Sequence, residues 1–151
     1  MTAAEGIAIG CDHAGFALKR EVLSKLREQG RAVEDCGTES EASVDYPDYA
    51  AKVARSVADG RHALGILVCG TGIGMSMAAN KVRGIRAALC HTEWEARLAR
   101  QHNDANVLCL GGRVLGTGLA FAIVEAFLTG TFEGGRHQRR LDQMAKMEGA
   151  R

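Results

Sequence analysis

The stretch Leu64-Gly-Ile-Leu-Val-Cys69, followed by Gly70-Thr-Gly-Ile-Gly74, decides the fold class. The first six residues form an apolar run with the length of a buried strand. The next five form a loop with alternating glycines, and helical spacing of apolar residues resumes at Met75, Ala78 and Val82. A buried strand that passes through a short loop into a helix is typical of the βαβ units of a parallel sheet.

The same alternation of short apolar runs and helical periods extends over most of the chain. The one proline, Pro47, stands where it can open a helix at its first position. The expected strands are 7–11, 32–36, 64–69, 85–90 and 106–110, and the expected helices are 16–29, 47–60, 75–82, 93–101, 116–128 and 136–147. We therefore predict an α/β fold, a three-layer α/β/α sandwich around a five-stranded parallel Rossmann-like sheet, as a single domain over residues 1–151.

Length and composition exclude several classes of protein. The 151 residues fit one domain, and 46% hydrophobic with 25% charged residues indicates a normal buried core, which excludes a disordered chain. There are 19 basic and 18 acidic residues, so the formal charge is +1. A general nucleic-acid binder needs a basic surface, so we expect no nucleic-acid partner. No apolar run approaches the roughly 18 residues that cross a bilayer, so we expect no membrane partner either.

The pattern of the five cysteines indicates the cellular compartment of the protein. They are widely spaced, odd in number and never arranged as Cys-x-x-Cys, so the sequence shows neither a disulfide framework nor a zinc-type ligand spacing. The N-terminal residues lack the basic-then-apolar pattern of a secretory signal. We therefore expect a cytoplasmic protein without a metal centre. The 19 glycines, beside a single proline, indicate tight loops at which the backbone meets a ligand.

Cys69 and the glycines after it form the first candidate site. A strand that runs through Gly70, Gly72 and Gly74 into a helix exposes several backbone N–H groups, which favour an anion together with the helix dipole. The Cys69 thiolate would face the helix N-terminus, so we interpret this residue as a reactive thiol beside an oxyanion pocket. The alternative is a small buried residue that ends a strand. The loop is not a dinucleotide fingerprint, because the position that requires glycine is Met75.

Polar residues beside two other predicted strands give further candidates. Asp12 and His13 follow the first strand, where contact with a ligand competes with the simpler role of a helix cap by Asp12. His102 ends a predicted helix, where it can act as a general acid or base or only offset the helix dipole. Ligands of such sheets bind at the carboxyl ends of the strands. His102 and Asn103 precede the fifth strand and fall at the opposite edge, so they would serve a neighbouring subunit or reach round the sheet.

The C-terminal helix carries the remaining candidates. Arg136 and Arg140 are four residues apart and share one helical face, and guanidinium groups suit phosphate oxygens. The alternative is a solvated basic helix, because residues 134–151 hold five basic and two acidic side chains. Leu141, Met144 and Met147 give the helix a thin apolar stripe, so we expect it to pack on a partner subunit.

Seven short motifs occur in order along the chain, from residue 7 to about residue 145. They are Gly10-Cys-Asp-His-Ala-Gly15, Asp45-Tyr-Pro-Asp-Tyr-Ala50, Cys69-Gly-Thr-Gly-Ile-Gly74, Ala79-Asn-Lys81, Arg100-Gln-His-Asn-Asp-Ala-Asn106, Gly112-Arg-Val114 and Glu133-Gly-Gly-Arg-His-Gln138. Any one of them is weak evidence. The ordered set resembles the type B ribose-5-phosphate isomerase family, also called the ribose/galactose isomerase family.

The resemblance implies a reversible aldose–ketose isomerisation of a sugar phosphate, D-ribose 5-phosphate to D-ribulose 5-phosphate, through a cis-enediolate and without a cofactor. It implies that Cys69 moves the proton between C2 and C1 and that His102 helps to open the furanose ring. The implied substrate contacts are Asp12, His13, Tyr46, Gly70, Thr71, Gly72, Ile73, Gly74 and Asn103. The implied phosphate ligands are Arg113, Arg136, His137 and Arg140. The resemblance also implies a homodimer or homotetramer whose active site draws residues from two chains.

The resemblance is to the branch of the family that has a cysteine base. Another branch lacks this cysteine and uses a glutamate at the end of the glycine loop, where this chain has Met75. Two alternatives stay open. One is an isomerase of another aldose phosphate, such as allose 6-phosphate, galactose 6-phosphate or a tetrose 4-phosphate. The other is a non-catalytic module that binds a phosphate ligand, which predicts no turnover and ligand binding that is indifferent to Cys69→Ala.

Overall fold

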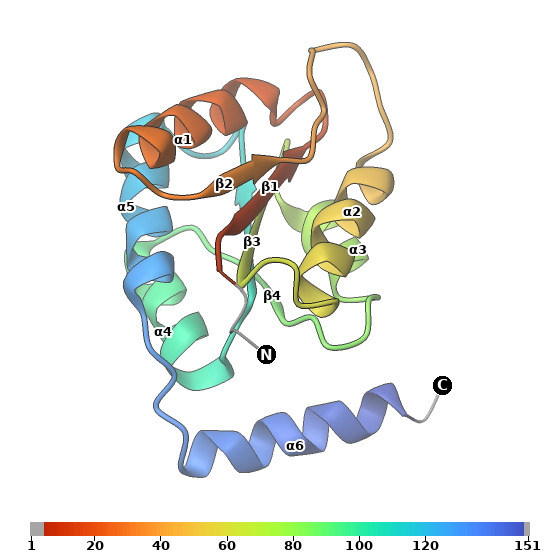
Figure 1. The fold of residues 1–151 in the computed structure, drawn as a ribbon, viewed down its shortest axis with the longest axis vertical. Helices are drawn as coiled ribbons and strands as arrows, with labels where there is room; N and C mark the ends of the chain where they lie inside the picture. Colours follow the sequence, from red (N-terminus) through yellow and green to blue (C-terminus); the bar gives the residue numbers. More distant parts are fainter. Residues whose placement is uncertain (1–4, 150–151) are drawn as a thin grey trace.

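In the computed structural model, which describes residues 5–149, five strands alternate with six helices (Figure 1). The strands are β1 (Ile7–Cys11), β2 (Val33–Asp35), β3 (Leu64–Cys69), β4 (Ala87–Leu89) and β5 (Val107–Gly111). The helices are α1 (Phe16–Glu28), α2 (Tyr46–Ala58), α3 (Ile73–Ala79), α4 (Glu93–Asn103), α5 (Thr117–Thr129) and α6 (Arg136–Glu148). Every expected element is present, with ends that differ by a few residues. Residues 1–4, which belong to the segment tested for a secretory signal, lie outside the described part.

The strands form one parallel sheet in the order β2-β1-β3-β5-β4. Helices α1, α4 and α5 pack on one face of this sheet, and α2 and α3 pack on the other (Figure 1). The predicted three-layer α/β/α sandwich with a five-stranded parallel sheet is therefore confirmed. None of the helices in the described part combines the length and the apolar character that a helix needs to span a bilayer.

Both edge strands of the sheet are short, because β2 and β4 have three residues each. On the outer side of β4, the side-chain amide of Asn80 donates to Ala87 O at 3.0 Å and accepts from Ala87 N–H at 2.8 Å. The strand is shorter than the expected 85–90 because Ile85 closes a turn, with its N–H donating to Val82 O at 3.2 Å.

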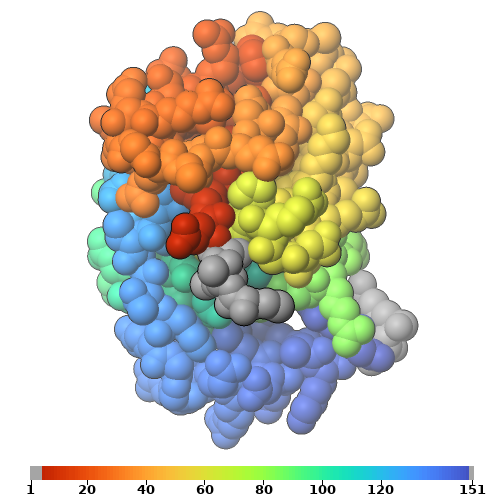
Figure 2. Space-filling model, in the orientation of Figure 1, coloured from red at the N-terminus to blue at the C-terminus, as the bar shows by residue number. Residues whose placement is uncertain are grey.

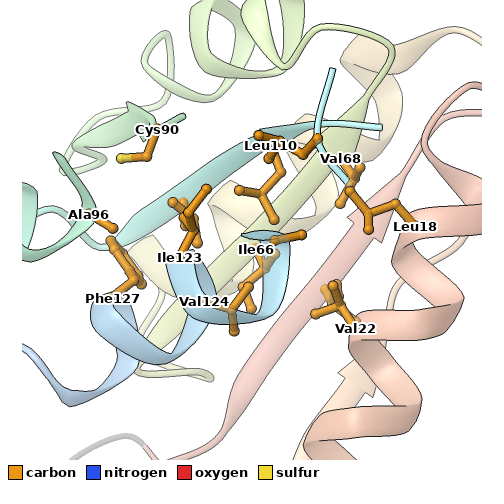
Figure 3. Close-up of a cluster of buried hydrophobic side chains, with 14 of the residues drawn as sticks. Leu18, Val22, Ile66, Val68, Cys90, Ala96, Leu110, Ile123, Val124 and Phe127 are labelled. Atoms are coloured by element: carbon orange, nitrogen blue, oxygen red, sulfur yellow. The ribbon is translucent and has the colours of Figure 1, made fainter. Parts of the chain in front are cut away.

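The larger core lies between the sheet and the layer of α1, α4 and α5 (Figure 3). Ile66 and Val68 of β3 contribute to it together with Val22 of α1 and Val124 of α5, and none of these side chains is more than 3% exposed. Burying one such side chain stabilises the fold by about 1.5–3 kcal/mol. Successive residues of a strand face opposite sides of the sheet, so Cys69 belongs to the second core with α2 and α3.

Helix α6 lies outside the three layers, across the end of the sheet at which the strands begin (Figures 1 and 2). Its Leu141 is buried, whereas Met144 and Met147 are 46% and 71% exposed. A cavity of about 480 Å³ lies between this helix and the turn before β4. The packing of α6 on a partner subunit stays a prediction.

Candidate active site

The loop after β3 holds the Cys69 thiol in a fixed place. Cys69 is the last residue of β3 and 5% exposed, and its Sγ accepts a hydrogen bond from Gly72 N–H at 3.1 Å. Gly72 has a φ of +80°, and a Cβ there would lie 2.5 Å from Leu89 Cδ1 and 3.0 Å from the carbonyl carbon of Leu110. A side chain does not fit this conformation or this space, so glycine keeps the N–H directed at the sulfur.

The same loop presents N–H groups that can bind an anion. Within residues 5–149, the amides of Gly70, Thr71 and Gly74 have no acceptor in the protein, whereas Ile73 N–H donates to Thr71 Oγ1 at 3.2 Å. Free amides in such a loop attract negative charge, and the α3 dipole adds to this effect. The arrangement can therefore hold a negatively charged oxygen beside the Cys69 sulfur.

Asp12 and His13 follow β1 and lie next to the loop. Asp12 is 6% exposed, and its N–H donates to Val68 O at 3.2 Å. Its Oδ1 accepts from Gly15 N–H at 3.0 Å, which closes the turn before α1. The N-cap of α1 is Gly15 and has no side-chain cap hydrogen bond, so the simpler interpretation of Asp12 as the helix cap is wrong. His13 Nδ1 accepts from Val44 N–H at 3.2 Å. Neutral His13 therefore carries its proton on Nε2, from which it can donate to a ligand.

Tyr46 and Arg113 border the loop on its exposed side. The Tyr46 ring packs on Gly74, where a Cβ would lie 2.7 Å from Cζ of the ring. Arg113 N–H donates to Gly70 O at 2.9 Å, and its side chain would touch a Cβ at Gly70 at 3.5 Å. The predicted site residues that meet at this carboxyl edge of the sheet are Asp12, His13, Tyr46, Cys69, Gly70, Thr71, Gly72, Ile73, Gly74 and Arg113.

The other predicted residues gather where α4 ends and α6 begins, a region called the α4–α6 corner below. The rings of His102 and His137 stack there, with centroids 4.2 Å apart and an angle of 11° between the planes. Both Nε2 atoms face Oε2 of Glu133, at 3.8 and 3.7 Å respectively. His137 is 6% exposed, and its burial, followed by the charge of neighbouring His102, lowers its pKa. Arg136 and Arg140 are exposed on the first turns of α6.

Glu133 is the residue of this corner that sequence reasoning missed. It occurs in one of the seven motifs, where the sequence shows no chemical role for it. Its position four residues before His137 is visible in the sequence. Its contact with His102 depends on the meeting of α4 and α6, which no local pattern reveals.

The two groups of residues lie at opposite ends of the strands, one where the strands end and one where they begin (Figure 1). Cys69 is opposite Gly111, the last residue of β5, whereas His102 and Asn103 end α4 shortly before Val107, the first residue of β5. A strand of five residues spans about 15 Å. His102 and Asn103 therefore lie at the amino ends of the strands, as the sequence predicted. Within one chain, His102 is not close to Cys69.

The remaining cysteines have no comparable setting. Burial raises the pKa of Cys11 to about 11 and that of Cys90 to about 12, and it raises the pKa of Cys109 still further. These thiols stay protonated at neutral pH, which fits structural roles in the cores. Cys69 differs from them because its sulfur accepts a backbone N–H at the start of an anion-binding loop.

A family model described as Ribose/Galactose Isomerase matches residues 7–144. This chain belongs to the ribose/galactose isomerase family. A protein of Escherichia coli (strain K12), named ribose-5-phosphate isomerase B, is 53% identical over 142 residues, which cover 94% of this chain and 95% of that relative. The resemblance carried by the seven motifs is thus confirmed over nearly the whole chain.

Solved structures of family members agree in fold. Ribose-5-phosphate isomerase B of Clostridium thermocellum superposes with a TM-score of 0.95 at 50% identity, covering 96% of this chain and 98% of that one. Ribose-5-phosphate isomerase B of Mycoplasma genitalium, solved with bound ribulose-5-phosphate, has a TM-score of 0.91 at 46% identity and covers 97% of each chain.

Proposed function

We propose that this chain interconverts D-ribose 5-phosphate and D-ribulose 5-phosphate. The observation that carries the proposal is the Cys69 thiol beside the free amides of Gly70, Thr71 and Gly74. The names of the Escherichia coli and Clostridium thermocellum relatives, and the ribulose-5-phosphate bound in the Mycoplasma genitalium relative, support this sugar.

The reaction needs a base and a site for an anion, because a C–H beside a carbonyl is a poor acid. Cys69 removes the proton from C2 of the open-chain aldose and returns it to C1. The loop amides stabilise the negative oxygen of the enediolate formed between these steps. A positioned base contributes about 10²–10⁴-fold and one oxyanion donor about 10²–10³-fold. One proton leaves C2 and one is added at C1, while the hydroxyl proton leaves O2 and O1 is protonated, so the balance requires no cofactor.

The α4–α6 corner supplies the other functions. His102 moves protons between the ring oxygen and O1 when the furanose opens, and Asn103 donates to the enediolate oxygen. Arg136, His137 and Arg140 bind the phosphate together with Arg113, which lies beside the glycine loop of the neighbouring chain. A phosphate held at the far end of the substrate fixes the position of the reacting carbons. Asp12, His13 and Tyr46 contact the sugar.

The complete site is formed by two chains of a homodimer, or of a homotetramer built from such dimers. The support is the distance between the two groups, since one chain keeps the α4–α6 corner about one strand length from Cys69. The corner of one subunit then faces the glycine loop of the next. Residues 1–151 act as one isomerase domain in this arrangement. Five cysteines without a disulfide among the described residues support a reducing, cytoplasmic location.

The test is turnover in deuterated water. Purified protein should convert D-ribose 5-phosphate to the ketose and place solvent deuterium on the carbon that receives the proton. Cys69→Ala should lose about 10³-fold in kcat, because the base is gone, with an unchanged thermal unfolding midpoint. Cys36→Ala, which removes a half-buried thiol directly after β2, serves as the matched control and should keep full activity.

Other outcomes would redirect the assignment. The assigned substrate would change if the protein turned over allose 6-phosphate, galactose 6-phosphate or a tetrose 4-phosphate but not the pentose phosphate. Binding of sugar phosphates with no turnover of any of them, and with no effect of Cys69→Ala, would establish the non-catalytic module instead.

A further inference from the structure

Three potential metal ligands meet at the α4–α6 corner. His102, Glu133 and His137 each offer one donor atom, and these atoms all lie within 4.8 Å of one another. The two Nε2 atoms are 3.8 and 3.7 Å from Oε2 of Glu133. Donor atoms around a tetrahedral zinc ion with bonds near 2.0–2.1 Å lie about 3.3–3.5 Å apart. The two histidine–carboxylate spacings therefore need to close by a few tenths of an ångström, and the separation of the two histidine donors, which is within 4.8 Å, has to reach the same range.

The backbone holds these three residues near one another. Glu133 N–H donates to Gln101 O at 3.0 Å, which fixes residue 133 to the last turn of α4 beside His102. Gly134 and Gly135, with φ of +65° and +56°, turn the chain so that α6 starts back toward α4. His137 N–H donates to Gly134 O at 3.1 Å and closes this turn. The cluster thus results from main-chain contacts and does not depend on long flexible side chains alone.

The side chains also have the freedom that coordination requires. The stacked rings are nearly parallel, so the two Nε2 lone pairs do not yet converge on one point. His137 is buried and keeps its place, whereas the side chains of His102 and Glu133 are 34% and 52% exposed. A tilt of the His102 ring away from the stack would turn its Nε2 toward the space beside His137 Nε2 and Glu133 Oε2, which are 3.7 Å apart.

The donor set selects a class of ion. Two imidazole nitrogens and one carboxylate oxygen suit zinc, nickel, cobalt or copper, whereas magnesium and calcium prefer oxygen ligands alone. Arg136 and Arg140 add positive charge nearby, which disfavours a cation and favours an anionic oxygen or water in the remaining position. Three protein ligands and one open position is the pattern of zinc sites that exchange their fourth ligand.

We propose that His102, Glu133 and His137 form a binding site for a divalent transition-metal ion, with zinc the best fit. If the proposed function holds, the bound ion occupies the histidine that opens the sugar ring, so zinc inhibits the isomerase. The binding itself is independent of the proposed function.

The first measurement is the visible spectrum of the chelator-treated full-length protein titrated with Co²⁺. We expect one site per chain, with d–d bands of a nitrogen–oxygen environment that Zn²⁺ bleaches and Mg²⁺ leaves unchanged. Glu133→Gln keeps the shape but removes the anionic ligand, so it should weaken Zn²⁺ binding by more than about tenfold. Glu93→Gln, an exposed glutamate at the other end of α4, is the matched control and should bind as wild type does.

Two results would overturn the proposal. One is unchanged Zn²⁺ affinity in both Glu133→Gln and His137→Gln. The other is a spectrum with sulfur-to-cobalt charge-transfer bands that disappears in Cys69→Ala, which would place the ion on a thiolate. Inhibition of turnover by Zn²⁺, relieved by chelator and reduced in Glu133→Gln relative to Glu93→Gln, is expected in addition. An inactive wild type that still gave the nitrogen–oxygen spectrum would reject the function and keep the metal site.

Discussion

The glycine loop and the α4–α6 corner hold their functional groups by different means. In the loop, the backbone itself is packed, and a Cβ at Gly72 or Gly74 would meet neighbouring atoms at 2.5 and 2.7 Å. In the corner, the groups are side chains on helix surfaces, such as His102 and Arg136, which remain partly or fully exposed. The loop is therefore complete within one chain, whereas the corner still has open surface on its functional side.

This difference matches the chemistry proposed for each region. Transfer of a proton from carbon needs a base and an oxyanion site held to a fraction of an ångström, which a close-packed backbone provides. Binding a phosphate or opening a ring tolerates side chains that adjust after the substrate arrives. In the proposed two-chain site, the rigid half would come from one chain and the adaptable half from another.

The largest expected effect comes from mixing two inactive variants. Cys69→Ala destroys the loop half and His102→Asn destroys the corner half, so each protein alone should lose nearly all activity. When they are unfolded and refolded together, half of the dimers pair one of each, and each such dimer holds one intact site. Activity should return to about a quarter of the wild-type value, measured per mole of chain.

A mixture that stayed inactive while forming mixed dimers, detected by mass-tagged subunits, would show that each site lies within one chain. The matched control is a mixture of two preparations of Cys69→Ala, which should gain nothing. A monomeric wild type in sedimentation would also contradict the two-chain site.

Gly72→Ala should have the next largest effect, on stability. The substitution adds left-handed strain to a collision with Leu89 and Leu110, so we expect a loss of about 3 kcal/mol or more in the free energy of unfolding. Gly30→Ala is the matched control, because Gly30 has a similar φ of +74° but nothing within 4 Å of its Cβ position. It should lose only about 1 kcal/mol. Equal losses in urea unfolding would mean that the loop is not closely packed.

The smallest expected effect concerns the start of α4, far from its functional end. Thr92 Oγ1 accepts from Glu95 N–H at 3.1 Å, and Glu95 Oε2 accepts from Thr92 N–H at 2.9 Å, forming a capping box. Thr92→Ala should cost about 1 kcal/mol of stability and leave kcat unchanged, since His102 lies at the other end of the helix. A fall in kcat comparable to that of His102→Asn would show that the corner depends on the whole helix.

The stabilisation that this capping box provides depends on pH. The N–H of His91 and further donors from Thr92 hold the pKa of Glu95 below its usual range. The stabilisation is therefore present above the ordinary carboxyl pKa and is lost as the pH falls through the lowered folded-state value. Thermal unfolding of Glu95→Gln and wild type should accordingly converge in acid.

The sequence is sufficient for the architecture and for the loop. The apolar run 64–69 and the glycines after it are local patterns, and both the strand and the turn into α3 follow from them. The placement of His102 before β5 is also local, since it depends only on the alternation of helix and strand. For this reason the opposite-edge position of His102 is predictable from the amino-acid sequence alone.

The α4–α6 corner and the buried polar contacts between distant segments could not be predicted in this way. Glu133 is 31 positions from His102 in the chain, and their contact depends on how α6 returns to α4. Lys19 is a second example. Its position beside Leu18 on α1 suggests an exposed lysine, yet it is 1% exposed, with Nζ 2.7 Å from Asp35 Oδ1 and 2.5 Å from Thr38 O. Such contacts arise between distant segments, where hydrophobic periodicity carries no information.

The short edges of the sheet have a consequence for how copies of this chain can associate. β2 and β4 offer three residues each, and the Asn80 side chain already satisfies Ala87 on the outer side of β4. A neighbouring strand would gain few backbone hydrogen bonds at either edge strand, so the sheet is poorly suited to extension into continuous sheets or fibrils. Association between copies of this chain would therefore have to use helices and loops.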